Sequence, residues 1–240
     1  MVKKIHYVWF GGNPLPAAVK SCINSWKKNC PDWEIIQWDE SNFDINKYIW
    51  VKEAIENRKY AFAADFVRLY VLNLYGGAYI DTDVEIIRNI DSSIQGDFVC
   101  GIQVPYVVSA DDIYNRLSLQ TGFLYSEKGH SFVKRAMQLI YNDGNRHFKA
   151  ADGSLATMPI DIELMSLLID EYGAQLKDEA QLLKDNIVLH DSTIYASRKS
   201  KNKNSYLIHW LDQTWKDNDG IIIILKKFVK RYLFFLYRKQ

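Results

Sequence analysis

The amino-acid sequence predicts an α/β protein, and three observations support this prediction. The chain has 240 residues, of which 48% are apolar, so one domain can bury a sizeable core. Its first forty residues read as a strand, a helix and a second strand. A long apolar helix followed by another strand occupies residues 61–87. Apolar strands separated by helices favour a sheet that helices cover on both faces.

The opening elements are predicted from their apolar runs and prolines. Ile5–Phe10 is a largely apolar run, as expected for a central strand. Residues 14–31 predict a helix because prolines bound the segment and apolar positions recur every four residues. Trp33–Trp38 predicts the second strand, and a weaker helix follows at Ile45–Arg58.

The rest of the chain is organised around residues 61–80, which are almost wholly apolar and predict a buried helix over their first fifteen positions. The segment carries only two charges, Asp65 and Arg68. These two residues lie three apart on one helix face, so they form either a structural ion pair or part of a site. Gly76 and Gly77 end the helix, since glycine accepts a left-handed conformation cheaply.

Two acidic residues follow the next predicted strand, Ala78–Ile80. Residues i and i+2 of an extended chain point the same way, so Asp81 and Asp83 can face one hard cation or its water shell. An Asp-Thr-Asp sequence is also a common surface turn, and these three residues alone leave both readings open. Together with the charged pair in the helix, they favour a ligand site at the carboxyl edge of the sheet.

The second half of the chain has shorter predicted elements. Strands are predicted at Val84–Ile87, Phe98–Gln103, Thr121–Leu124 and Ile187–Leu189, and helices at His130–Tyr141 and Pro159–Asp170. Residues 104–120 have no clear period and predict a loop or short helix over the site. The sequence contains no Gly-rich dinucleotide fingerprint and no phosphate loop of the Lys-Ser/Thr type.

Four short motifs follow one another in the first ninety residues. They are Ile-His-x-x-Trp-x-Gly from Ile5, Ala-Asp-x-x-Arg-x-x-x-Leu from Ala64, Gly-Gly-x-Tyr from Gly76 and Asp-x-Asp from Asp81. In this order they resemble glycosyltransferase family 32, which holds bacterial capsular-polysaccharide enzymes and fungal mannosyltransferases. The chain is also distantly similar to the glucosylating domains of large clostridial toxins. Beyond residue ninety the resemblance is carried by one late cluster at residues 209–215.

The resemblance implies a GT-A fold over residues 1–219, with a mixed, mainly parallel central sheet flanked by helices. It implies a metal-dependent, retaining transfer of a sugar from a nucleotide-diphosphate sugar. The expected acceptor is a glycan or lipid-linked oligosaccharide in surface polysaccharide synthesis, and the expected cation is Mn²⁺ or Mg²⁺. A cation that bridges the diphosphate oxygens stabilises the charge that builds up as the sugar departs.

The resemblance also implies roles for the charged residues. Asp83 is expected to bind the metal directly, and Asp81 to contact the ribose and the water shell of the metal. Asp65 and Arg68 are expected to hydrogen-bond sugar hydroxyls beside the reacting centre, and Arg68 also to offset the charge of the carboxylates. His209 is the third expected metal ligand, with a core histidine as the alternative.

Two tryptophans complete the expected donor site. By similarity Trp9 stacks on the nucleobase, which contributes roughly 1–3 kcal/mol, unless it is simply a core aromatic residue. Trp215 is expected to donate its indole N–H to a phosphate. It follows Thr214, where the family usually has serine.

Charge and cysteine content limit the partners and the compartment. The net charge of +1 implies no general affinity for nucleic acid. Three cysteines without Cys-x-x-Cys spacing are typical of a reduced, intracellular protein. The apolar run near the amino terminus is too short for a secretory signal or a membrane span. We therefore expect a cytoplasmic location.

The carboxyl-terminal segment, residues 220–240, differs in composition from the rest. It lacks acidic residues, and six lysines and arginines interrupt a run of aliphatic and aromatic residues. On a helix most of the basic residues share one face, so residues 221–240 predict contact with an anionic membrane surface on the inner face of the cell membrane. The alternative is a terminal helix packed on the protein itself or on a partner chain.

Two other functional classes remain open from the sequence. Phosphatases of the haloacid dehalogenase kind also have Asp-x-Asp after an apolar strand, with the first aspartate as nucleophile. Their later Ser/Thr, Lys and paired-acid signals have no convincing counterpart in this chain. A non-catalytic module that binds sugar nucleotide or lipid is the second alternative.

Overall fold

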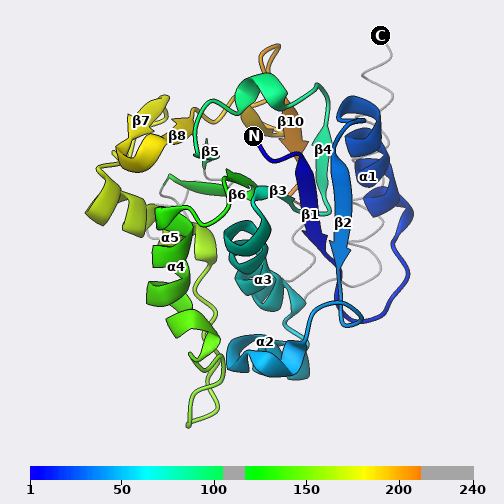
Figure 1. Ribbon diagram of the computed structural model, residues 1–240, viewed down its shortest axis with the longest axis vertical. Coiled ribbons are helices and arrows are strands. Elements are labelled where there is room, and N and C mark those ends of the chain that lie inside the picture. The colour runs from blue at the N-terminus through cyan, green and yellow to red at the C-terminus, as the bar shows by residue number, and fades with distance from the viewer. Residues whose placement is uncertain (105–116, 212–240) are drawn as a thin grey trace. The chain divides into compact units, whose positions relative to one another are not determined.

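The computed structural model describes residues 1–104 and 117–211, and Met1–Trp210 form one compact unit. A seven-stranded sheet runs through this unit in the order β2-β1-β3-β6-β5-β8-β7 (Figure 1). Its strands are β1 (Lys4–Val8), β2 (Glu34–Trp38), β3 (Gly77–Ile80), β5 (Phe98–Gln103), β6 (Ser118–Ser126), β7 (Gln181–Leu183) and β8 (Ile187–His190). Strands β6 and β7 run antiparallel to the other five. The predicted α/β architecture with a mixed, mainly parallel sheet is confirmed.

Within the described ranges, five α-helices surround the sheet. They are α1 (Ala17–Asn29), α2 (Ile49–Glu56), α3 (Tyr60–Tyr75), α4 (Ser131–Tyr141) and α5 (Ile160–Leu167). Short 3₁₀ turns occupy Ile45–Lys47, Asp91–Ser93, Asn142–Gly144 and Lys184–Asn186, and a π-helical turn occupies Leu168–Tyr172. Helix α3 packs on β1 and β3, and α2 and α4 pack on α3 (Figure 1). The single helix predicted at Ile45–Arg58 is therefore a 3₁₀ turn followed by α2.

A second, three-stranded sheet has the order β4-β10-β9. Strands β4 (Val84–Ile86), β9 (Tyr195–Ser197) and β10 (Leu207–His209) have three residues each. The sequence predicted β4 but not β9 or β10, because three residues are too few to show a strand period. Strand β10 pairs antiparallel with β4, which places His209 opposite Val84. This pairing carries the late part of the chain to the end of β3.

The predicted buried helix is α3, and it lies at the centre of the core. Phe66, Val67, Leu69, Val71 and Leu72 are all 0% exposed. Burying an aliphatic or aromatic side chain contributes about 1.5–3 kcal/mol, so this one helix supplies a large share of the apolar driving force. Its burial fixes the direction in which the polar side chains of the same helix point.

Two glycines end α3 as predicted. Gly76 has φ 69° and ψ −175°, a conformation that is essentially restricted to glycine. Gly77 must also be glycine, because a Cβ atom at this position would lie 2.6 Å from the Lys4 carbonyl oxygen. The tight junction brings β3 alongside β1, with Ala78 opposite Ile5 and Tyr79 opposite His6. The acidic loop after β3 therefore starts at the carboxyl ends of adjacent parallel strands.

Three predictions fall wholly or partly on segments outside the described residues. These are the loop or short helix at residues 104–120, the domain boundary at residue 219, and the tail at residues 220–240. Of the first segment, the structure describes Val104 and residues 117–120, and Ser118, Leu119 and Gln120 belong to β6 and not to a loop. Among the helices of the described ranges, none combines the length and apolar character needed to cross a membrane. Cys22, Cys30 and Cys100 are buried and form no disulfide.

Candidate metal and sugar-nucleotide site

The acidic loop between β3 and β4 is anchored at both ends by backbone hydrogen bonds. The Asp81 N–H donates to the Gly122 carbonyl oxygen at 2.9 Å, which ties the start of the loop to β6. The Val84 N–H donates to the Asp81 carbonyl oxygen at 3.0 Å and closes the turn. The Trp210 N–H donates to the Asp83 carbonyl oxygen at 3.1 Å. The two carboxylates are therefore carried by a short, fixed turn.

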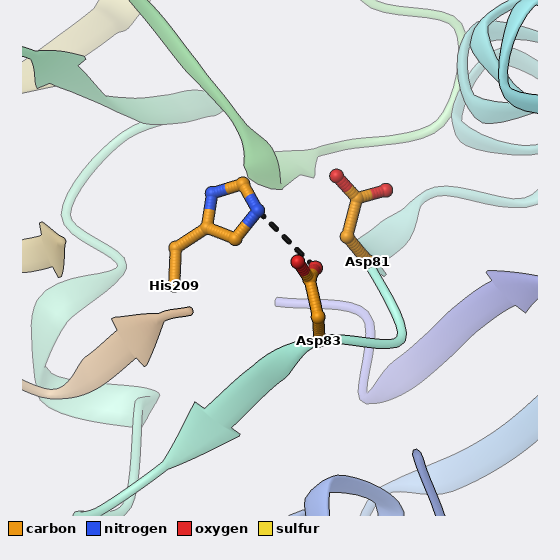
Figure 2. A group of neighbouring side chains, drawn as sticks. All are labelled: Asp81, Asp83 and His209. Carbon is orange, nitrogen blue, oxygen red and sulfur yellow. Dashed lines mark ion pairs between the residues drawn. The ribbon is translucent and has the colours of Figure 1, made fainter. Parts of the chain in front are cut away.

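The three expected metal ligands come together at this turn, with His209 contributed by β10. One ligand atom from each of Asp81, Asp83 and His209 lies within 4.8 Å of the other two. Figure 2 shows the His209 ring facing the Asp83 carboxylate, with Asp81 beside them. His209 Nε2 lies 3.2 Å from Asp83 Oδ1. Two carboxylates and an imidazole form a donor set that suits Mn²⁺, with Mg²⁺ the better match for the oxygens alone.

The site is partly open to solvent. The side chains of Asp81 and Asp83 are 26% and 22% exposed, whereas that of His209 is 10% exposed. Burial lowers the pKa of His209, but the negative charge of Asp83, helped by Asp81, outweighs burial and leaves this pKa above its ordinary value. The carboxylates of Asp81 and Asp83 thus place negative charge at one solvent-accessible point, with the imidazole ring of His209 beside it. A cation at this point would offset that charge.

Arg68 links the acidic loop to α3. Its Nη2 lies 3.1 Å from Asp65 Oδ1 and 3.1 Å from Asp81 Oδ1. Burial lowers the pKa of the guanidinium, but Asp81 and Asp65 outweigh this effect and keep Arg68 charged. The guanidinium also lies over the Tyr79 ring, with Cζ 4.6 Å from the ring centroid. The charged pair predicted in the helix therefore extends to the acidic loop.

Asp65 is more buried than Asp81. Burial raises the pKa of Asp65 to about 7, although Arg68 opposes the shift. Asp81, Asp161 and Glu163 add to the shift by like-charge repulsion. The Asp65 side chain is 15% exposed. A carboxyl group held in this way can both accept and donate hydrogen bonds near neutral pH, as a sugar-binding group requires.

Sequence reasoning missed two acidic residues near Asp65. Asp161 and Glu163 lie in the first turn of α5, and their charges reach Asp65. Burial raises the pKa of Asp161, while a hydrogen bond from the Ser118 hydroxyl opposes the rise. Nothing in the sequence marked these residues, because they lie about one hundred positions from Asp65 and belong to a short, largely apolar helix without a recognised motif.

Sequence reasoning also missed Gln120 and Gly122, which lie in β6. Gln120 is 1% exposed, and its Oε1 is 2.9 Å from His209 Nδ1. The Gly122 N–H donates to the same Oε1 at 2.9 Å. The expected strand, Thr121–Leu124, began one residue too late to include Gln120. No motif in the sequence connects this glutamine to a histidine 89 positions away.

The two expected tryptophans have different outcomes. Trp9 directly follows β1, so it lies at the same carboxyl edge of the sheet as the acidic loop. It is partly exposed and outside the buried core, and its indole N–H donates to the Asn13 carbonyl oxygen at 2.6 Å. Thr214 and Trp215 lie outside the described residues.

Comparison with known proteins agrees with the resemblance. A family model described as "Glycosyltransferase sugar-binding region containing DXD motif" matches residues 16–99. The chain is 37% identical over 97 residues to inositol phosphoceramide mannosyltransferase 3 of Schizosaccharomyces pombe, covering 37% of this chain and 26% of that protein. It is 40% identical over 65 residues to mannosyl phosphorylinositol ceramide synthase SUR1 of Saccharomyces cerevisiae, covering 25% of this chain and 17% of that protein.

Among solved structures, a galactosyltransferase, LgtC, in complex with donor and acceptor sugar analogues matches with a TM-score of 0.47 and 11% identity, covering 90% of each chain. The chain spans about a quarter or less of the curated relatives. The matched segment runs from α1 through the acidic loop to the start of β5. Residues 16–99 are therefore similar to a glycosyltransferase sugar-binding region that contains a DXD motif, and the chain also resembles the two mannosyltransferase-type relatives.

Proposed function

We propose that this protein is a metal-dependent glycosyltransferase that moves a sugar from a nucleotide-diphosphate donor to a glycan or lipid-linked acceptor. The observation that carries the proposal is the convergence of His209 on Asp81 and Asp83, which lie in the segment similar to a sugar-binding region. These residues come from two segments more than one hundred positions apart in the sequence. A simple surface turn has no need of a buried imidazole from a distant strand.

The donor set assigns a role to each residue around the proposed cation. Asp83 and His209 bind it directly, and Asp81 contacts it or its water shell. A bound Mn²⁺ or Mg²⁺ would supply positive charge to the diphosphate leaving group. Arg68 holds Asp81 in place and offsets part of the carboxylate charge, so that the loop keeps its shape before donor binds.

Asp65 is the proposed sugar-binding carboxyl group. Its pKa of about 7 allows it either to donate a hydrogen bond to a sugar hydroxyl or to accept one from it. Arg68 orients it through the 3.1 Å contact. Because Arg68 is only 4% exposed, the geometry favours charge balance and orientation over direct sugar contact for this residue.

Trp9 is the proposed stacking partner of the nucleobase. It is partly exposed at the carboxyl end of β1, and its indole N–H donates to the Asn13 carbonyl oxygen, a hydrogen bond that stacking through the ring face would not disturb. Trp215 remains the proposed phosphate-binding residue on sequence resemblance alone.

We further infer that the transfer retains the configuration of the donor sugar. A front-face mechanism needs no protein nucleophile, because the leaving diphosphate itself can take the acceptor proton.

The names of the two relatives describe mannose transfer to inositol phosphoceramide, which supports a lipid-linked acceptor and makes mannose the first donor sugar to test. Surface polysaccharide synthesis at the cytoplasmic face of the membrane, with the tail of residues 221–240 on the lipid, is the proposed setting.

A panel of nucleotide sugars tests the proposal. The protein is mixed with each donor, with and without Mn²⁺, and its thermal stability and the release of nucleotide diphosphate are measured. We expect stabilisation and slow hydrolysis that require both the metal and one particular donor. Binding without hydrolysis or transfer would indicate a binding module, and release of phosphate from simple esters would indicate a phosphatase. Either result would contradict the proposal.

A further inference from the structure

The side chain of Gln120 makes two hydrogen bonds through one oxygen atom. Its Oε1 lies 2.9 Å from the Gly122 backbone nitrogen and 2.9 Å from His209 Nδ1. A backbone N–H can only donate a hydrogen bond, so the Gln120 atom facing Gly122 must be the carbonyl oxygen and not the amide nitrogen. The Gly122 N–H therefore determines which way the amide group of Gln120 is oriented.

This orientation determines which nitrogen of His209 carries a proton. A carbonyl oxygen can only accept a hydrogen bond, so His209 Nδ1 must be the donor. A metal binds the neutral imidazole, in which only one nitrogen carries hydrogen; with that hydrogen on Nδ1, the lone pair is on Nε2. Nε2 is the atom that faces Asp83, at 3.2 Å. The contact with Gln120 therefore prepares Nε2, and not Nδ1, to bind a cation.

The glycine at position 122 provides the space that this arrangement needs. A Cβ atom there would lie 2.7 Å from both Cε1 and Nδ1 of His209, and 3.0 Å from Gln120 Oε1. Real Cβ atoms essentially never approach so closely, so the histidine ring packs directly on the bare backbone of β6. Gln120 thus holds the His209 ring by a hydrogen bond at Nδ1, and the backbone at Gly122 packs closely against the ring.

We propose that Gln120 is a positioning residue that fixes the tautomer and the orientation of His209 for metal binding. The inference rests on the metal site of the proposed function and adds a residue that would not contact the metal itself. Hydrogen-bond acceptors behind metal-binding histidines commonly fix the ring in this way, and their loss weakens metal affinity about 10–100-fold. We therefore expect substitution of Gln120 to change the affinity for the metal and not the affinity for the sugar donor.

Two substitutions of similar size separate this role from simple packing. Gln120→Met keeps the length of the side chain but removes the acceptor. Gln120→Glu keeps an acceptor for both N–H groups but introduces a charge at a buried position. If Gln120 only fills space, Met is the milder change, because an apolar residue suits a buried site. If it positions His209, Glu is the milder change for metal binding.

The experiment measures Mn²⁺ affinity of the full chain by electron paramagnetic resonance titration, without any sugar nucleotide. We expect Gln120→Met to weaken Mn²⁺ binding about 10–100-fold and Gln120→Glu to match the wild type or bind more tightly. Circular dichroism melting shows that each variant is folded under the conditions of the titration. Equal Mn²⁺ affinity for Gln120→Met and the wild type would overturn the role of Gln120. Failure of the wild type to bind Mn²⁺ would instead overturn the metal site, and with it this proposal.

A second measurement reports the tautomer directly. Nitrogen-15 NMR of the His209 ring, with diamagnetic Cd²⁺ in place of Mn²⁺, should show a protonated Nδ1 and a metal-bound Nε2 in the wild type. The Gln120→Met variant should lose this single pattern. A wild-type ring bound through Nδ1, or an unchanged pattern in Gln120→Met, would contradict the proposal. If Gln120 instead contacts the donor, its substitution would raise KM for the donor at unchanged Mn²⁺ affinity, which would also overturn it.

Discussion

His6 Nε2 lies 2.9 Å from the carbonyl oxygen of Gly76, the residue that ends α3. On the other side of the ring, Trp38 Nε1–H donates to His6 Nδ1 at 3.1 Å. Since Nδ1 accepts, Nε2 must carry the proton and donate it to Gly76. His6, from the first of the four motifs, thus holds Gly76, from the third, in place. This hydrogen bond explains why a histidine stands in an apolar strand.

This arrangement predicts a pH dependence of stability. Burial lowers the pKa of His6, whereas an imidazole in the unfolded chain titrates near pH 6.5. As the pH falls, the unfolded state takes up the proton first. The contribution of neutral His6 is therefore fully present above about pH 6.5 and is lost as the pH falls toward the folded pKa.

Urea unfolding of the wild type and of His6→Gln at several pH values measures this contribution. The wild type should lose more stability than the variant between about pH 7 and pH 5. Half-buried His190, whose pKa burial also lowers, acts in the same direction in both proteins and cancels in the comparison. Parallel curves for the two proteins would contradict the prediction.

Asp83→Asn should abolish metal-dependent turnover while the fold is retained. The substitution keeps the size of the side chain but removes the charge that faces His209 and the proposed cation. We expect turnover to fall by about 100-fold or more, the scale seen when one charge-stabilising group is removed from a reacting centre. Asp170→Asn, at an exposed position in the π-helical turn, is the matched control and should be fully active. Undiminished turnover of Asp83→Asn would remove the central assignment.

Arg68→Met should destabilise the protein by about 3–5 kcal/mol, because it leaves buried Asp65 and nearby Asp81 without their shared cation. Denaturant unfolding measures the loss. The double variant Asp65→Leu and Arg68→Met should recover part of the stability, since it removes the most buried of the unpaired charges. Additive losses in the double variant would show that the two residues are not energetically coupled.

Gly122→Ala should weaken Mn²⁺ binding through steric displacement of His209. The backbone at this position does not require glycine, so the effect arises from the 2.7 Å approach of the new Cβ to the ring. We expect a loss of about 1–3 kcal/mol in stability together with the weaker metal binding. Gly153→Ala is the control, because φ there is +85° but no atom lies within 4 Å. It should lose stability through backbone strain and keep its Mn²⁺ affinity.

Deletion of residues 232–240 should abolish sedimentation with anionic liposomes. The removed segment carries basic and apolar residues that suit the boundary between lipid phosphates and acyl chains. Neutral liposomes provide the control and should sediment little of the full-length protein. Unchanged binding of the shortened chain to anionic liposomes would contradict a membrane role for the tail.

The sequence alone determined the elements whose signals are local. The apolar run of α3 and the glycines after it predicted a buried helix, a sharp stop and a strand. The acidic pair at the end of that strand led to the hypothesis of a metal site, and the order of four motifs indicated the resemblance to glycosyltransferases. Each of these signals depends on residues within one or two turns of each other, where periodicity and backbone propensity act directly.

Only the tertiary structure decided how distant segments complete the site. The three-residue strand β10 has no recognisable period, and it is held by its pairing with β4 and β9. That pairing places His209 between Asp83 and Gln120, and no local rule relates these three positions. Likewise, the charges of Asp161 and Glu163 reach Asp65 because α5 packs on β6 near α3. Such contacts result from the burial of whole helices and sheets against one another, and this burial is a property of the complete chain.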